Sequence, residues 1–364
     1  MFSKFLALTS STLVAVTVSF YPGVAQTDSS LDIAQANPLE LNNLLLKGKQ
    51  YVDAQDYDQA LATYEQAATL DSNNAQIFSG IGYVHTLKKN YGAAAQAYQR
   101  AIAITPDDPK LYYALGYSLG NAGENAQAAA AYEMAIKLEP DNIQNHIGLG
   151  VVLLREKEYD KAVKSYYRVL ALAPKNEQAY KIISSVLIEQ QRYPEVIALL
   201  QTAVKQNPQL AGLHLPLATA LLNQGDTAAG LQALKVAQKI DPQNPSIYLK
   251  TGEVLYLQGD LDGALAEYKQ AARLQSDSAQ AIEGMGNIYL AKQNYFQSIV
   301  AFRHLTEISP NYPLGYHNLG VALKARNRND EAIAAFNQAL ELYKGEGNTK
   351  EAKKVASLIE EINN

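Results

Sequence analysis

A 34-residue period is the feature that most constrains what this chain can fold into. Proline recurs at that step at Pro106, Pro140, Pro174, Pro208 and Pro242, and Pro310 follows two periods later. Glycine, alanine and an aromatic residue keep the same step, at Gly48, Gly82, Gly116, Gly150, Gly252, Gly286 and Gly320, at Ala60, Ala94, Ala128, Ala162, Ala264 and Ala332, and at Tyr64, Tyr98, Tyr132, Tyr166, Tyr268, Phe302 and Phe336. Such periods are typical of arrays whose units bury their apolar faces only by stacking. The sequence therefore predicts a stack of like units.

Counted from Leu41, the units run without insertion or deletion, and we expect nine repeats at 41–74, 75–108, 109–142, 143–176, 177–210, 211–244, 245–278, 279–312 and 313–346. The Gly, Ala, aromatic and Pro series occupy unit positions 8, 20, 24 and 32. This pattern resembles the tetratricopeptide repeat (TPR). The resemblance implies an all-α fold, a right-handed superhelical solenoid of helix–turn–helix hairpins.

Each unit should hold two amphipathic helices. In the third unit, one helix should end near Asn121–Gly123 and the next should run from Asn125 to Leu138, because Pro140 disfavours a helical residue before it. After the array, residues 347–364 should form a capping helix. Asn348 and Glu351 there fit a capping box.

The fifth and sixth units depart from the pattern. They carry Ser184 and Ala218 in place of glycine, and Leu200 and Leu234 in place of the aromatic residue. Pro216 lies inside the expected first helix of the sixth unit, so we predict a kink or an altered stacking angle around residues 211–218. A functional hinge and simple sequence drift both remain open as explanations.

The N-terminus differs from the rest. Residues 1–25 show one Lys, an apolar segment and a small-residue cleavage site after Ala25, the pattern of a secretory signal peptide. Residues 26–40 should form a polar tether. We expect an exported protein, with the periplasm as the preferred compartment. The alternative is a protein that stays membrane-anchored through residues 5–20.

Composition argues against several classes of chemistry. The chain has no cysteine, which excludes disulfides, thiol catalysis and Cys-based zinc sites. Its net charge of −5 disfavours nucleic acid as a partner. His146 and His214 share unit position 4 and should pack in the core of separate hairpins. No motif for a metal, a cofactor or a catalytic site stands out, so we expect a protein without catalytic residues that is not an enzyme.

The resemblance also implies a concave groove lined by the first helices of the hairpins, at unit positions 2, 5, 9, 12 and 13. A family variant grips a terminal carboxylate there with Lys and Asn, but only Lys181 matches at its place, so no such clamp is expected. Glycines at position 6 (Gly80, Gly148 and Gly284) should widen the groove wall. The residues predicted to contact a partner are Gln76, Tyr83, Tyr117, Asn121, Gln144, Gln178, Lys181, Asn223, Lys250, Glu253 and Asn287.

Amides can pair with the backbone of an extended peptide, and Tyr offers rigid contact area. The sequence therefore favours a non-enzymatic scaffold or complex-assembly factor that binds protein or peptide segments. The alternative is a TPR subunit of an envelope apparatus that secretes polysaccharide or protein. Both roles would allow association with a membrane-bound complex.

Overall fold

The computed structural model describes residues 38–363, and within them the chain forms helices and no strand. The predicted signal peptide and residues 26–37 of the predicted tether lie outside the described residues. Residues 38–40, which the sequence assigned to the tether, instead belong to the first described helix, α2 (Pro38–Asp53). Pro38 stands at its first position, where a missing N–H costs no helical hydrogen bond.

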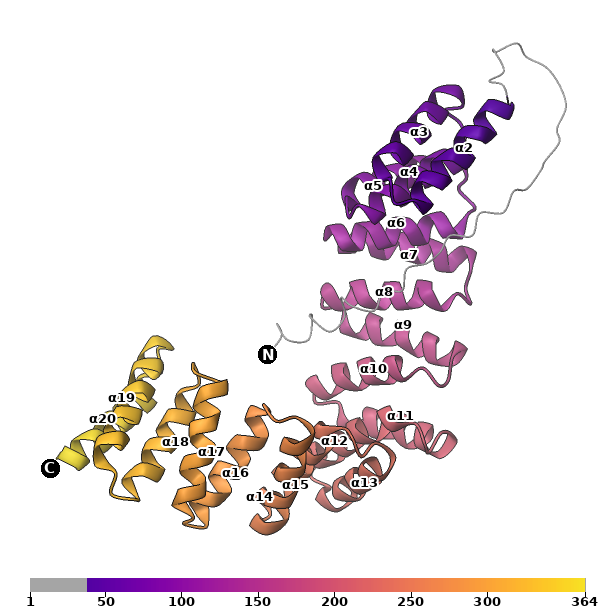
Figure 1. The fold of residues 1–364 in the computed structure, drawn as a ribbon. Coiled ribbons are helices and arrows are strands. Elements are labelled where there is room, and N and C mark those ends of the chain that lie inside the picture. The colour runs from indigo at the N-terminus through magenta and orange to yellow at the C-terminus, as the bar shows by residue number, and fades with distance from the viewer. Residues whose placement is uncertain (1–37, 364) are drawn as a thin grey trace. The chain divides into compact units, whose positions relative to one another are not determined.

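Two compact units make up the chain, divided between Val186 and Leu187. Within each unit the helices follow one another as hairpins (Figure 1). The first unit contains α2, α3 (Tyr57–Leu70), α4 (Ala75–Leu87), α5 (Tyr91–Ile104), α6 (Pro109–Ala122), α7 (Asn125–Leu138), α8 (Ile143–Arg155) and α9 (Tyr159–Leu172), and the division falls within α10 (Glu177–Glu189).

The second unit continues with the helices that carry the remaining repeats and the C-terminal end. They are α11 (Tyr193–Gln206), η1 (Ala211–Leu213), α12 (His214–Gln224), α13 (Thr227–Ile240), α14 (Pro245–Leu257), α15 (Leu261–Leu274), α16 (Ala279–Ala291), α17 (Tyr295–Ile308), α18 (Pro313–Lys324), α19 (Asn329–Gly345) and α20 (Thr349–Asn363). The described chain is an all-α solenoid of helical hairpins, as the sequence predicts.

Local sequence sets where the helices of a hairpin begin and end. Before α6, the Asp108 carboxylate accepts a hydrogen bond from the backbone N–H of Lys110 at 2.9 Å, satisfying one of the donors that a helix start leaves unpaired. After α6, Gly123 adopts a left-handed conformation with φ of 90°, which a residue without Cβ does readily. Both predicted boundaries of the third hairpin are confirmed, and α7 spans Asn125–Leu138 as expected.

Three of the five repeated tyrosine rings lie between glycines of two consecutive hairpins. A Cβ on Gly116 would come within 3.0 Å of the Tyr132 ring, and a Cβ on Gly148 in the next hairpin within 2.4 Å of it. The arrangement recurs with Tyr64 between Gly48 and Gly80, and with Tyr268 between Gly252 and Gly284. The glycines that were expected to widen a groove wall therefore do something else, because they make room for the preceding hairpin's ring.

The sixth repeat redistributes side-chain volume. Gly230 replaces the usual alanine, and the space that its Cβ would need is filled by Leu222, whose Cγ would lie 2.5 Å away. Leu234, which replaces the aromatic ring, is fully buried. Leu222 thus fills the space beside Gly230, and Leu234 occupies the place of the larger aromatic ring. Together these changes keep the side chains of the irregular repeat closely packed.

Around Pro216 the helix is shorter than the sequence predicted. The 3-10 turn η1 precedes α12, which begins at His214 and not near Ala211. Pro216 is thus the third residue of α12, where the backbone N–H has no acceptor within the α-helix. The local alteration predicted for 211–218 is present as this 3-10 turn. Pro216 therefore lies in the first turn of α12 and not in the helix interior, where the sequence placed it.

The last helix covers the apolar end of the array, as predicted. Val355 and Ala352 of α20 are buried in a core with Phe336, and Leu358, Ile359 and Ile362 pack against that core. The Asn348 side chain accepts from the Glu351 N–H at 3.3 Å, which is one half of the expected capping box. The Glu351 carboxylate pairs with Lys354 at 2.8 Å.

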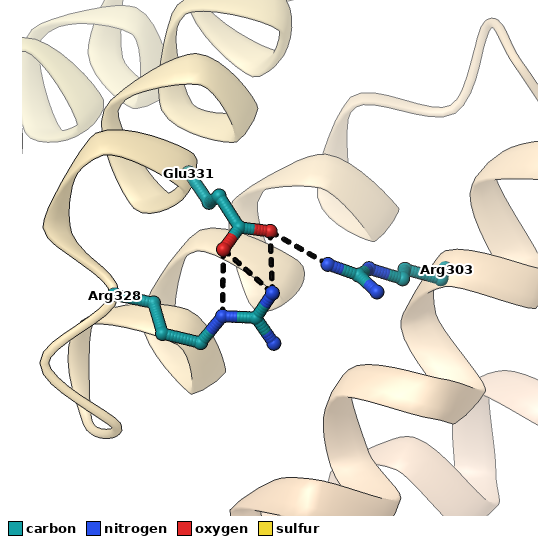
Figure 2. Close-up of polar contacts among 3 residues, drawn as sticks. All are labelled: Arg303, Arg328 and Glu331. Carbon is teal, nitrogen blue, oxygen red and sulfur yellow. Dashed lines mark hydrogen bonds and ion pairs between the residues drawn. The ribbon is translucent and has the colours of Figure 1, made fainter.

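Polar contacts between second helices join neighbouring hairpins near the surface. In the second unit, Glu331 of α19 accepts hydrogen bonds from Arg328, which precedes the same helix, and from Arg303 of α17 at 2.7 Å (Figure 2). All three side chains are exposed enough that such ion pairs contribute about 1 kcal/mol or less each. Apolar packing, not these pairs, holds the hairpins together.

Candidate partner-binding face

The first helices of successive hairpins contact one another and form one layer in each unit. In the first unit α2 contacts α4, α4 contacts α6 and α6 contacts α8, and in the second α14 contacts α16 and α16 contacts α18. We call these helices, together with α10 and α12, the A-helices. Every predicted partner-binding residue lies on them: Gln76 and Tyr83 on α4, Tyr117 and Asn121 on α6, Gln144 on α8, Gln178 and Lys181 on α10, Asn223 on α12, Lys250 and Glu253 on α14, and Asn287 on α16.

None of these side chains is fully buried. Six are exposed, namely Gln76, Gln144, Gln178, Lys181, Asn223 and Glu253, and the other five are half-buried. Two of the exposed amides, Gln76 and Gln144, lie two residues after the asparagine caps that start α4 and α8, and their backbone N–H groups donate to those caps. All eleven residues are therefore accessible from solvent, which a binding role requires.

Tyr117 packs against another tyrosine of the first unit. The Tyr117 ring meets the Tyr91 ring edge-on, with centroids 6.3 Å apart. Burial, followed by the influence of Tyr91, raises the pKa of Tyr117 above its ordinary value. Burial, followed by Tyr57 and Asp53, does the same to the pKa of Tyr83. Both phenols stay neutral at physiological pH and offer a flat ring with a hydroxyl that can donate or accept.

Asn121 is partly engaged within its own helix. Its Nδ2 donates to the Tyr117 carbonyl at 2.8 Å. Beside it, Arg155 at the end of α8 donates from Nη1 to the Gly120 carbonyl at 2.5 Å. Arg155 was absent from the predicted site although it occupies unit position 13, one of the positions named for the groove.

Aliphatic side chains on α8 were also missed. Ile147, Val151 and Leu154 occupy unit positions 5, 9 and 12 and are only half-buried. Their spacing of three and four residues places them along one side of the helix. The pattern of unit positions could have identified them. The first unit therefore presents aliphatic side chains beside the amides and tyrosines that the sequence predicted.

In the second unit, Lys250, Glu253 and Asn287 are paired with neighbouring side chains. Lys250 and Glu253 form an ion pair at 2.7 Å, and Asn287 accepts from the amide of Asn318 at 3.1 Å. Glu283, which was not predicted, accepts from the Tyr312 hydroxyl at 3.0 Å. The Asn287–Asn318 and Glu283–Tyr312 contacts join two consecutive hairpins, whereas the Lys250–Glu253 pair lies within α14. All three contacts occupy polar atoms that a partner would need.

His146 and His214 are structural, as predicted. Each is buried, and its Nε2 donates to the carbonyl of a proline six residues earlier, Pro140 at 2.8 Å and Pro208 at 2.9 Å. The hydroxyl of Tyr248, at the same unit position, donates to the Pro242 carbonyl at 3.0 Å. This contact joins α8, α12 and α14 to the turns that precede them.

Across residues 38–363, no group of three or more His, Asp or Glu side chains is arranged to hold a metal ion. Over the same range, no helix combines the length and apolar character needed to cross a membrane.

Models of the tetratricopeptide repeat family match most of the chain. A tetratricopeptide repeat model matches residues 45–109 and 113–177, and a second matches 187–251. A TPR repeat model matches 252–293, and a further tetratricopeptide repeat model matches 277–345.

Individual relatives share shorter segments. A TPR repeat-containing protein of Picosynechococcus sp. is 34% identical over 85 residues, covering 23% of this chain and 22% of the relative. The peroxisomal targeting signal receptor of Kluyveromyces lactis is 37% identical over 59 residues, covering 16% of this chain and 10% of the receptor. The matched segments thus span less than a quarter of either relative.

Two solved structures are similar at low identity. Yeast Tom70 is 12% identical with a TM-score of 0.46, over 90% of this chain and 96% of that one. YrrB, described as a TPR protein with an unusual peptide-binding site, is 21% identical with a TM-score of 0.41, over 52% of this chain and 97% of that one. From the family matches, the hairpin architecture and the repeated glycine–aromatic packing, this chain belongs to the tetratricopeptide repeat family.

Proposed function

We propose that this protein is a non-enzymatic scaffold or complex-assembly factor that holds a segment of a partner protein against the A-helices of its first unit. Membership of a family built around protein–protein interaction supports the general role. The half-buried side chains of Tyr83, Tyr117, Ile147, Val151 and Leu154 support the location.

The exposure of these apolar and aromatic groups is the observation that carries the proposal. Side chains that serve only the core of a hairpin are sealed, as Tyr132 is at 2% exposure. Those on α4, α6 and α8 keep part of their surface in water, and covering it with a partner would release that water. Tyrosine anchors at the centre of an interface commonly carry much of its binding energy.

Photo-cross-linking in cells tests this location. A photoreactive amino acid in place of Tyr117 should give discrete protein adducts. The same amino acid in place of Glu133, an exposed residue on the second helix α7, should give few. Equal labelling from both positions would contradict a specific face. Adducts dominated by polysaccharide- or protein-secretion components would favour the alternative role as a subunit of a secretion apparatus.

A paired substitution tests the tyrosines themselves. Tyr83→Ala combined with Tyr117→Ala should release the cross-linked partner in a pull-down, with each truncation costing about 2 kcal/mol of binding. Tyr83→Phe with Tyr117→Phe keeps both rings and should retain most of the partner. Full binding by the double alanine variant, with an unchanged helical circular dichroism spectrum, would rule out the tyrosines as anchors.

We also propose that the protein acts after export, because residues 1–25 read as a signal peptide. Mass spectrometry of the protein recovered from its cells should find Gln26 at the N-terminus. An intact N-terminus together with membrane fractionation would favour the anchor alternative, and an intact N-terminus in the soluble cytoplasm would contradict export.

A further inference from the structure

Three consecutive A-helices of the first unit carry no acidic side chain. The chain as a whole has 36 Asp and Glu residues against 31 Lys and Arg. Yet no carboxylate side chain occurs on α4, α6 or α8, whose only Lys or Arg residues are Lys110 and Arg155. The net charge of these three helices is therefore opposite in sign to that of the whole chain.

Arg155 is the centre of this region. Arg155 is a half-buried residue, and the hydrogen bond from its guanidinium to the Gly120 carbonyl uses one of five N–H donors. It forms no ion pair with any of the described residues, 38–363. A carboxylate is the partner whose geometry matches the fork of N–H donors that a guanidinium presents.

Tyrosine hydroxyls accompany the guanidinium. The rings of Tyr113 and Tyr132 meet edge-on with centroids 5.8 Å apart. Burial raises the pKa of Tyr132, the nearby Tyr113 and Tyr117 raise it further, and Arg155 opposes them. The hydrogen bond from Arg155 to the Gly120 carbonyl places the guanidinium at the last turn of α6, next to Asn121 and one helical turn from Tyr117. These groups provide neutral and charged donors for one anionic group.

Apolar surface adjoins these donors. Ile147, Val151 and Leu154 lie at spacings of four and three residues along α8, on the side that leads to Arg155. A ligand that placed a carboxylate at Arg155 could therefore lay aliphatic or aromatic side chains on α8.

We propose that α6 and α8 form a subsite for an Asp or Glu side chain within an extended, otherwise apolar segment of the partner, with Arg155 as its counter-charge and Tyr113, Tyr117 and Asn121 beside it. The inference rests on the proposed function, since it specifies the partner chemistry of the same face. Predicted contact residues flank the subsite on both sides, Tyr83 on α4 and Lys181 on α10. An internal carboxylate, with chain continuing in both directions, fits this layout.

Selection from random peptides tests the inference. The full chain without residues 1–25 would be panned against two libraries, one with the random segment inside a longer chain and one with it at a free C-terminus. The internal library should yield an Asp or Glu flanked by Leu, Ile, Phe or Tyr. A synthetic peptide from the selection should bind at least about tenfold more weakly when its acidic residue is changed to the amide.

Variants of the protein locate the effect. Arg155→Gln, which can still donate to the Gly120 carbonyl, should bind the acidic peptide and its amide version equally. Lys110→Gln makes the same charge change on an exposed residue of α6 and should keep the discrimination. If circular dichroism shows that Arg155→Gln does not fold, the salt dependence of binding to the unaltered protein serves as the test. Affinity for the acidic peptide must then fall with ionic strength more steeply than affinity for its amide version.

Each alternative outcome has a separate meaning. Selected peptides without acidic residues would overturn the subsite and leave the proposed partner-binding function standing. Selection of the C-terminal library alone would overturn the internal carboxylate in favour of a chain end. If neither library binds while Tyr117 cross-links partners in cells, the subsite fails and the function survives. If both experiments fail, the function fails too.

Discussion

At the scale of single residues, the ring of Tyr132 sets how closely two hairpins approach. It reaches from the second helix of the third hairpin to the first helix of the fourth, and glycines at Gly116 and Gly148 leave room for it. In the sixth repeat Leu234 replaces the aromatic residue, and the equivalent of Gly116 there is Ala218. A small residue opposite a large ring is the rule that these positions follow, because interiors are close-packed.

Gly148→Ala should therefore destabilise the protein. The new Cβ would lie 2.4 Å from Cε1 and Cζ of Tyr132. The Tyr132 ring is buried and also packs against Gly116, so it has little freedom to shift. We expect a loss of about 1–3 kcal/mol in the free energy of unfolding, measured by urea denaturation. Gly92→Ala, with no atom within 4 Å of its new Cβ, should instead gain up to about 1 kcal/mol from helix propensity. Equal effects at both sites would contradict the packing argument.

Buried tyrosines also predict an alkaline limit to stability. Burial raises the pKa of Tyr98 to about 12, and burial together with Asp53 raises that of Tyr64 to about 12. In the unfolded chain both ionise near pH 10, so between about pH 10 and 12 the unfolded state binds fewer protons than the folded one. Stability should be complete below about pH 10 and fall as the pH rises toward 12.

Urea titrations at about pH 9 and pH 11 would measure this fall. In Tyr98→Phe, which removes one buried hydroxyl, the fall should be smaller than in the unaltered chain. A free energy of unfolding that does not change between these pH values would contradict the assignment.

At the scale of elements, Pro216 shows how a helix adapts to a residue that the repeat does not favour. The chain starts α12 at His214 and inserts the 3-10 turn η1 before it. Proline then stands in the first turn, where its missing N–H has no helical acceptor to lose. A sequence pattern alone places the proline inside the helix, because it assumes that every first helix starts at the same unit position.

Pro216→Ala should therefore change stability little. We expect a difference within about 1 kcal/mol, in place of the gain of about 3 kcal/mol that relief of an interior proline would bring. Lys235→Pro, at an exposed interior position of α13, should cost about 3 kcal/mol or more and serves as the matched control. A large gain on Pro216→Ala, seen in thermal and urea unfolding, would contradict the first-turn position. Whether repeats five and six act as a hinge stays a prediction.

At the scale of the whole molecule, stability comes from packing between neighbouring hairpins. The chain has no cysteine, and its ion pairs are exposed or half-exposed. In a solenoid each repeat contacts only its neighbours, so stability is close to a sum of local terms. At the C-terminal end of the array, α20 covers the apolar face of the last hairpin, and its Val355 is fully buried there.

Thermal unfolding should be indifferent to reductant and to chelator. With no thiols to oxidise and no metal cluster across residues 38–363, the midpoint with dithiothreitol or with EDTA should match that of the untreated protein within experimental error. Human carbonic anhydrase, which holds a zinc ion, would serve as the positive control for the chelator. A fall in the midpoint with EDTA would reveal a metal held elsewhere in the chain.

The sequence by itself determined the family, the all-α class and the boundaries of the third hairpin. The helix boundaries follow from local chemistry. Pro140 ends a helix, Gly123 adopts a left-handed backbone conformation and Asp108 caps a helix start, and each effect depends only on residues nearby in the chain. It also identified Tyr83 and Tyr117 as accessible, and His146 and His214 as structural.

Only the tertiary structure decided what depends on residues far apart in the chain. It placed the Tyr132 ring in the space of Gly148, started α12 after a 3-10 turn, and paired Asn287 with Asn318. It also left Arg155 half-buried with no ion-pair partner in residues 38–363. A repeat pattern gives each residue a position within its own unit. Which atoms from the next unit meet that residue depends on side-chain volume and rotamer, which the period does not encode.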